Sequence, residues 1–201
     1  KIEPKSGEFN TRNNQASVFV EVVEGKKKIL LVAGSPHPDI KALREVVNKN
    51  PNYEFLLHIP GMEELSSDAI NPEKIDLVIF HQVPDVRGKI RIIFEQFLRS
   101  KTSIFLIVGS QTDLAFLSKQ NVPVAFESIP REYDEVLAAT NPAFSQFSLT
   151  AETNEIIQDY PPVSVPFGKM KLQGNVMPIL YQRIGSLTTQ MPLLYLNILD
   201  D

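Results

Sequence analysis

"KILLVAGSPHPDIKALREVVNKN", residues 28–50, is the stretch that decides the fold prediction. It opens with a nearly continuous apolar run that ends at Gly34, which is typical of a strand covered on both faces. From Pro38 onward the apolar side chains recur at helical spacing. Pro38 suits a first helical turn, and Asp39 complements the positive end of the helix dipole. We therefore predict a buried strand that leads directly into an amphipathic helix.

The same alternation continues along the chain. Further strands are predicted at residues 53–59, 75–82, 103–110 and 122–127, and helices at residues 87–100 and 112–120. Thr112 is expected to cap the second of these helices. Strands that alternate with helices of this length predict a parallel sheet with helices on both faces. The fold class is therefore α/β, a three-layer flavodoxin-like arrangement.

Beyond about residue 128 the pattern changes to a β-rich elaboration at the edge of the sheet. Strands are predicted at residues 135–144, 147–152 and 191–199, a helical turn at 155–160, and an extended loop at 160–168. Residues 176–185 and 191–199 should form a hairpin around Gly185-Ser186.

The first 25 residues differ from the rest. Residues 17–23 form a β-branched strand pattern, and one strand is not stable alone. We expect residues 1–25 to be a linker strand or the end of a preceding β-sandwich, and residues 26–201 to form the α/β domain. The chain begins with Lys1 rather than methionine, so it is expected to be a piece of a longer protein.

Composition excludes several classes of function. The net charge of -4 argues against nucleic-acid binding, which usually needs a basic excess. No apolar stretch is long enough to cross a membrane, so this fragment is not expected to insert directly. The absence of cysteine excludes disulfides, thiolate metal sites and a cysteine nucleophile, and it fits an oxidising compartment.

Polar residues follow the predicted strands. In open parallel sheets, ligands bind beyond the carboxyl ends of the strands. The candidate ligand-binding rim consists of His37, Asp39, His81, Gln82, Ser110 and Gln111. His58 also follows a strand, so three histidines could share one rim. They could bind a metal or an anion, or they could be solvated or bonded to backbone.

Two catalytic motifs are incomplete. His37-Pro38-Asp39 resembles the start of the His-Pro-Asp-Asp-Glu motif of LmbE-like zinc deacetylases, in which the histidine and the second aspartate bind zinc. Here Ile40 and Lys41 replace the last two residues, and no histidine follows residue 81. A stiffened turn is therefore the preferred interpretation, and no metal or cofactor is predicted.

Ser110 occupies a second incomplete motif. It follows a strand as a nucleophile elbow would, but Val108 and Thr112 stand where that motif has glycine. With no histidine after residue 81 to act as a base, we interpret this segment as a structural turn.

"DLVIFHQVP" (76–84) and "SIFLIVGSQTDLAFL" (103–117) resemble the core of class I glutamine amidotransferase-like domains. In catalytic members the first strand ends in Pro-Gly-Gly, and the later strand ends in a Cys-x-Gly elbow. Here the first end is 81–84, His-Gln-Val-Pro, and the elbow cysteine falls at about Val108 or Gly109. The late His-x-Glu pair has no counterpart. The resemblance therefore implies the scaffold without glutaminase chemistry.

A wider set of segments, adding "YPPVSVPFG" (160–168) and "ILYQRIGSLTTQMPLLYL" (179–196), is similar to uncharacterised membrane-anchored proteins of Bacteroidetes-type bacteria. That resemblance implies an extracytoplasmic, periplasmic domain of a membrane-anchored protein. The predicted function is a non-catalytic domain that binds a protein partner, another domain of the same chain or a ligand at the rim. The alternatives are a metal-assisted or serine hydrolase that uses the rim histidines, and a structural spacer.

Overall fold

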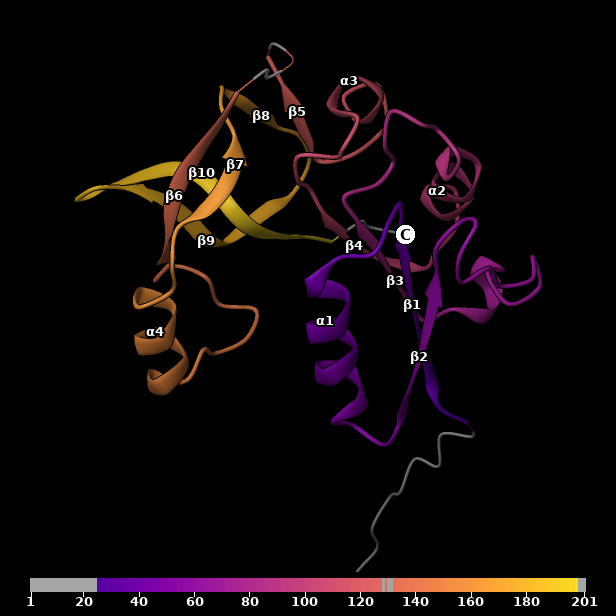
Figure 1. Cartoon of the computed structure of the whole chain (residues 1–201). Coiled ribbons are helices and arrows are strands. Elements are labelled where there is room, and N and C mark those ends of the chain that lie inside the picture. Colours follow the sequence, from indigo (N-terminus) through magenta and orange to yellow (C-terminus); the bar gives the residue numbers. More distant parts are fainter. Residues whose placement is uncertain (1–24, 128, 130–131, 199–201) are drawn as a thin grey trace, which may run out of the picture.

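The computed structural model describes residues 25–127, 129 and 132–198 (Figure 1). This part of the chain is a mixed α/β structure with one parallel sheet and additional antiparallel sheets. The strand predicted at residues 17–23 lies outside the described residues, as does most of the expected linker.

The parallel sheet contains the strands predicted from the apolar runs. Its strands are β1 (Lys27–Ala33), β2 (Tyr53–His58), β3 (Leu77–His81) and β4 (Ser103–Ile107), in the order β2-β1-β3-β4. Strand β1 pairs with β2 on one side and with β3 on the other, and β3 also pairs with β4. The central strands are buried on both faces, which explains why their sequences are apolar at successive positions.

Helices cover both faces of this sheet, as predicted (Figure 1). On one face Ile40 and Val47 of α1 (Pro38–Asn48) join Leu31 and Ile79 in a buried cluster. The opposite face holds a larger cluster that includes Leu30, Val32, Val78, Phe80 and, from α2 (Arg91–Leu98), Phe94 and Phe97. The two helices therefore pack their apolar sides against opposite faces of the sheet.

The cap predicted for the second short helix was wrong. Helix α3 (Leu114–Leu117) begins after Asp113, whose carboxylate accepts a hydrogen bond of 3.0 Å from the amide of Phe116. The Thr112 hydroxyl turns back instead and accepts a hydrogen bond of 3.0 Å from the Gly109 amide. Thr112 is buried, and it therefore stabilises the turn after β4 rather than the helix.

An antiparallel sheet forms the β-rich elaboration. Its strands are β6 (Tyr133–Thr140), β7 (Val163–Pro166), β9 (Val176–Ile184) and β10 (Leu187–Asn197), in the order β10-β9-β6-β7. The predicted hairpin is confirmed, because β9 and β10 pair across Gly185, whose φ of 57° lies in the left-handed region.

The strand predicted at residues 122–127 does not extend the parallel sheet. Strand β5 (Val124–Phe126) pairs antiparallel with β8 (Met170–Leu172) in a separate two-stranded sheet. Its partner β8 lies far along the chain, so this antiparallel pairing depends on a long-range contact that the local sequence does not specify.

Two further predictions in this region were wrong or incomplete. Residues 147–152 are not a strand, because Thr150 caps α4 (Ala151–Gln158) by accepting a hydrogen bond of 3.1 Å from the Thr153 amide. The segment at 160–168 is not simply a loop, since it contains β7. The helical turn predicted at 155–160 corresponds to the second half of α4.

The polypeptide between β2 and β3 contains only a short 3-10 helix, η2 (Pro72–Lys74). Within the described residues, no helix is long and apolar enough to cross a membrane.

The antiparallel sheet reaches the parallel one at Tyr133, whose hydroxyl donates a hydrogen bond of 3.1 Å to the carbonyl of Gly109. This bond connects β6 to the turn after β4.

Candidate functional site

The turn between β1 and α1 places His37 and Asp39 together. His37 has an extended backbone, with φ -150° and ψ 146°, and it caps α1. Its Nδ1 atom accepts a hydrogen bond of 3.3 Å from the amide of Asp39. Pro38 occupies the first turn, where a missing amide hydrogen does not matter. The predicted helix start therefore also orients the candidate site.

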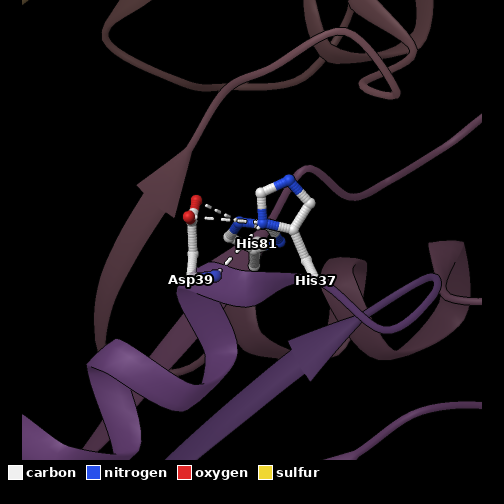
Figure 2. A group of neighbouring side chains, drawn as sticks. All are labelled: His37, Asp39 and His81. Atoms are coloured by element: carbon white, nitrogen blue, oxygen red, sulfur yellow. Dashed lines mark hydrogen bonds and ion pairs between the residues drawn. The ribbon is translucent and has the colours of Figure 1, made fainter.

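His81 reaches the same place from the end of β3. Strand β3 pairs with β1 so that His81 stands beside Ala33, just before the turn that leads to α1. The His81 Nε2 atom lies 3.0 Å from one carboxylate oxygen of Asp39, and His37 Nδ1 lies 3.3 Å from the other. Figure 2 shows both imidazoles turned toward the carboxylate. The centroids of the two rings lie 4.7 Å apart.

Ligand atoms of these three residues, which we call the His37–Asp39–His81 cluster, all lie within 4.8 Å of one another. Burial differs sharply across it: the side chains of His81, His37 and Asp39 are 2%, 32% and 52% exposed. The cluster is therefore anchored in the sheet at one end and open to solvent at the other. Two imidazoles and a carboxylate in this arrangement can share a proton or bind a cation.

Gln82 extends the site along the rim. Its side-chain nitrogen Nε2 lies 3.5 Å from His37 Nε2. Its side-chain oxygen Oε1 accepts a hydrogen bond of 3.2 Å from the backbone amide of Gln111. The Gln111 side-chain oxygen in turn accepts a hydrogen bond of 3.1 Å from the Ser35 hydroxyl. The structure therefore joins Gln82 and Gln111 to the cluster by hydrogen bonds.

Gln82 also has an unusual backbone. Its φ of 54° lies in the left-handed region, which residues other than glycine rarely adopt. Such conformations concentrate at functional sites, where the surrounding structure holds them in place.

Ser110 is the predicted rim residue that the structure does not bring into this network. It is exposed, and within the described part of the chain its hydroxyl bonds to neither His37 nor His81.

His58 has a separate structural role. It ends β2, and its Nδ1 atom accepts a hydrogen bond of 3.2 Å from the Leu65 amide. Burial lowers the pKa of His58, and the nearby Glu64 carboxylate opposes this shift. This histidine therefore does not join the cluster, since β1 separates its strand from β3.

Sequence reasoning missed Asp85, a buried carboxylate just behind the rim. It accepts a hydrogen bond of 3.2 Å from the Gly88 amide, and the Arg87 guanidinium lies 3.5 Å away. Gly34 needs to be small, because a Cβ there would lie 3.0 Å from an Asp85 oxygen. The available signal was an aspartate soon after a strand end, at the position where parallel sheets concentrate polar residues.

A groove of about 350 Å³ adjoins the cluster along α1. It is lined by Pro36, His37, Ile40, Lys41, Arg44, Leu57, Ile59, Met62 and Glu63. Its floor is apolar, and Arg44 stands at its wall, 3.7 Å from Glu63. The groove therefore offers a mixed apolar and charged surface next to His37.

The site thus combines a buried imidazole, a second imidazole, a carboxylate and two amides at the carboxyl edge of a parallel sheet. This is the edge where α/β proteins bind their ligands. Comparisons of this chain with known protein families, with curated proteins and with solved structures find no match.

Proposed function

We propose that this domain binds a ligand or a protein partner at the carboxyl edge of its parallel sheet and does not itself catalyse a reaction. One observation carries the proposal: His37, Asp39, His81, Gln82 and Gln111 converge there from three separate strand ends. Convergent polar groups beside a groove are the usual form of a small-ligand site.

The proposed scaffold is flavodoxin-like and of the amidotransferase-like type. The strand order β2-β1-β3-β4 supports this, because flavodoxin-like sheets begin with the same order. The lack of any cysteine supports a domain without glutaminase chemistry, since the elbow position falls at Val108 or Gly109. The fifth parallel strand of that scaffold is not among the described strands.

We further propose that the domain is extracytoplasmic and belongs to a membrane-anchored protein, where its partner is another protein or another domain of the same chain. The support is the sequence resemblance described above, together with the absence of cysteine, which suits an oxidising compartment.

A metal-assisted hydrolase is the second candidate function. The observation that favours it is the spacing of the His37–Asp39–His81 cluster, which would leave a coordination position for water. A serine hydrolase is less well supported, because neither His37 nor His81 is within hydrogen-bond distance of Ser110 in the described structure.

Nuclear magnetic resonance would test binding directly. Amide resonances of ¹⁵N-labelled protein are recorded with a library of small carboxylates, amides and phosphates. Binding at the rim predicts shifts concentrated at residues 34–39, 81–82 and 109–111, which weaken in Gln111→Ala. The same compounds offered as esters and anilides test catalysis: turnover that disappears in His37→Ala or His81→Ala would overturn the non-catalytic assignment.

A further inference from the structure

We propose that the His37–Asp39–His81 cluster binds one divalent transition-metal ion of the zinc type. This inference rests on the proposed function, because it specifies what the rim binds first. It also goes beyond the sequence prediction, in which no metal was expected at these residues.

The distances between the ligand atoms suit a metal ion. Zinc binds imidazole nitrogen and carboxylate oxygen at about 2.0–2.2 Å, so neighbouring ligands of a tetrahedral site lie about 3.3 Å apart. His81 Nε2 lies 3.0 Å from one Asp39 oxygen, and His37 Nδ1 lies 3.3 Å from the other. With one ligand atom taken from each residue, all three atoms lie within 4.8 Å of one another. Small changes in side-chain torsions would therefore be enough to enclose an ion.

The types of ligand select the class of metal. Magnesium and calcium prefer sites made of oxygen atoms, whereas imidazole suits zinc, iron, nickel and copper. Two imidazoles with one carboxylate therefore favour a divalent transition metal over the hard cations. The carboxylate of Asp39 also supplies negative charge next to the ion, and no lysine or arginine forms an ion pair with it among the described residues.

The fold holds these side chains in place before an ion arrives. His81 is almost fully buried, and its strand pairs on both sides, beside Ala33 of β1 and Ile107 of β4. His37 and Asp39 are fixed by the first turn of α1. A site built on a strand and a helix start is more rigid than one built on loops.

The solvent-exposed side of the cluster would leave the bound ion a coordination position for a ligand. Three protein ligands leave at least one coordination position free, and catalytic or ligand-binding zinc sites use that position for water or an incoming group. The exposed side of Asp39 and His37 faces solvent, and His37 also lines the groove along α1. A bound ion could therefore hold the polar group of a ligand whose apolar part lies in the groove.

Metal binding would replace existing interactions. An ion at His81 Nε2 would displace the 3.0 Å contact of that atom with the Asp39 carboxylate. An ion at His37 Nδ1 would take the lone pair that accepts the hydrogen bond from the Asp39 amide. This hydrogen bond is 3.3 Å long, which places it at the weak end of the range. The competing interpretation is that the cluster only ties α1 to β3 through hydrogen bonds, and it predicts no specific metal affinity.

Titration calorimetry with ZnCl₂ separates these interpretations. The untagged full chain is first treated with a chelator and dialysed. We expect one zinc ion to bind per chain, with Asp39→Asn weakening the affinity by about 100-fold or more, since even indirect partners of metal ligands cost 10–100-fold. Glu45→Gln on the same helix and His58→Asn outside the cluster serve as matched controls, and neither should change the affinity.

Cobalt absorption provides a second readout. Co²⁺ in a site with two imidazoles should give visible absorption bands that disappear in Asp39→Asn and in His81→Asn. Circular dichroism confirms that each variant is folded. If His81→Asn fails to fold, Asp39→Asn alone still decides the question, because its side chain is half exposed.

The outcomes separate the two proposals. Absence of zinc binding, or binding that Asp39→Asn leaves unchanged, would overturn the metal site. If the small-ligand titration described above still shifted the rim amides, the proposed binding function would survive that result. If the rim amides did not respond either, both proposals would fail.

Discussion

The side chain of Gln82 occupies the space directly beside Gly109. A Cβ built on Gly109 would lie 2.5 Å from the amide carbon of Gln82 and 2.6 Å from its oxygen. That oxygen accepts the hydrogen bond from Gln111. The turn after β4 is therefore shaped around a side chain from the end of β3.

Gly109→Ala should displace Gln82 and break its bond with Gln111. We expect a loss of about 1–3 kcal/mol in unfolding free energy, the usual cost of forcing extra volume into a packed site. Urea denaturation measures it. The double variant Gln82→Ala/Gly109→Ala provides the control, since the glycine substitution should cost much less once the glutamine side chain is gone. Additive losses would contradict the close contact.

Tyr133→Phe should weaken the connection between the two sheets. It removes the hydrogen bond to the Gly109 carbonyl, and such bonds contribute about 0.5–1.5 kcal/mol. Because Tyr133 is partly exposed, the loss should fall at the lower end. Tyr53→Phe is the matched control, since no hydrogen bond is found for its hydroxyl within the described residues. Equal effects from both variants would argue against this role.

His58 should make folding stability depend on pH. Burial lowers its pKa in the folded state, so below an ordinary pKa of about 6.5 the unfolded chain binds the proton more readily. The contribution is therefore complete above that pH and decreases as the pH falls. Thermal denaturation between pH 7.5 and 5.5 should show a smaller decrease for His58→Asn, which keeps an acceptor for the Leu65 amide without titrating. Parallel curves for the two proteins would refute the prediction.

Zinc should stabilise the folded domain if the proposed metal site exists. A ligand that binds only the folded state at 100 times its dissociation constant adds about 2.7 kcal/mol. Denaturation with and without ZnCl₂ should show this gain in the wild type and not in Asp39→Asn. A similar gain in both proteins would place the bound zinc elsewhere.

Phe80→Ala should be the most destabilising of these substitutions. Phe80 is fully buried and makes edge-to-face contacts with Phe94 and Phe97, at centroid distances of 4.9 and 5.8 Å. Truncation of a buried phenylalanine costs about 3–5 kcal/mol. Ile92→Ala, on the exposed side of α2, should change stability by less than about 0.5 kcal/mol. Comparable losses at the two positions would contradict the assigned packing.

The central strands β1 and β3 were predictable because burial on both faces leaves an apolar run at each one. The outer strands β2 and β4 are partly exposed but still carry mostly apolar residues. The helix after β1 was equally clear, since Pro38 and the apolar spacing indicate it independently. The partners of β5 were not predictable. Three residues carry too little pattern to separate a parallel strand from an antiparallel one, and the pairing with β8 depends on a segment far along the chain.

The site, too, was predictable only where its residues are close together in the sequence. His37 and Asp39 share one turn, so their proximity could be inferred from local sequence. The contact of His81 with Asp39 requires β3 to lie beside β1, which no local pattern specifies. The same sheet order also explains why His58, at the end of an outer strand, does not take part.

His81 and Asp39 are 42 residues apart in the chain, and they meet only after β3 has paired with β1. Formation of the His81–Asp39 contact therefore reports when the central strands pair during folding. A spectroscopic probe at the His81 imidazole would not respond to formation of α1 and would respond when the central strands pair. A stopped-flow refolding experiment that follows this response would measure the time at which β1 and β3 pair.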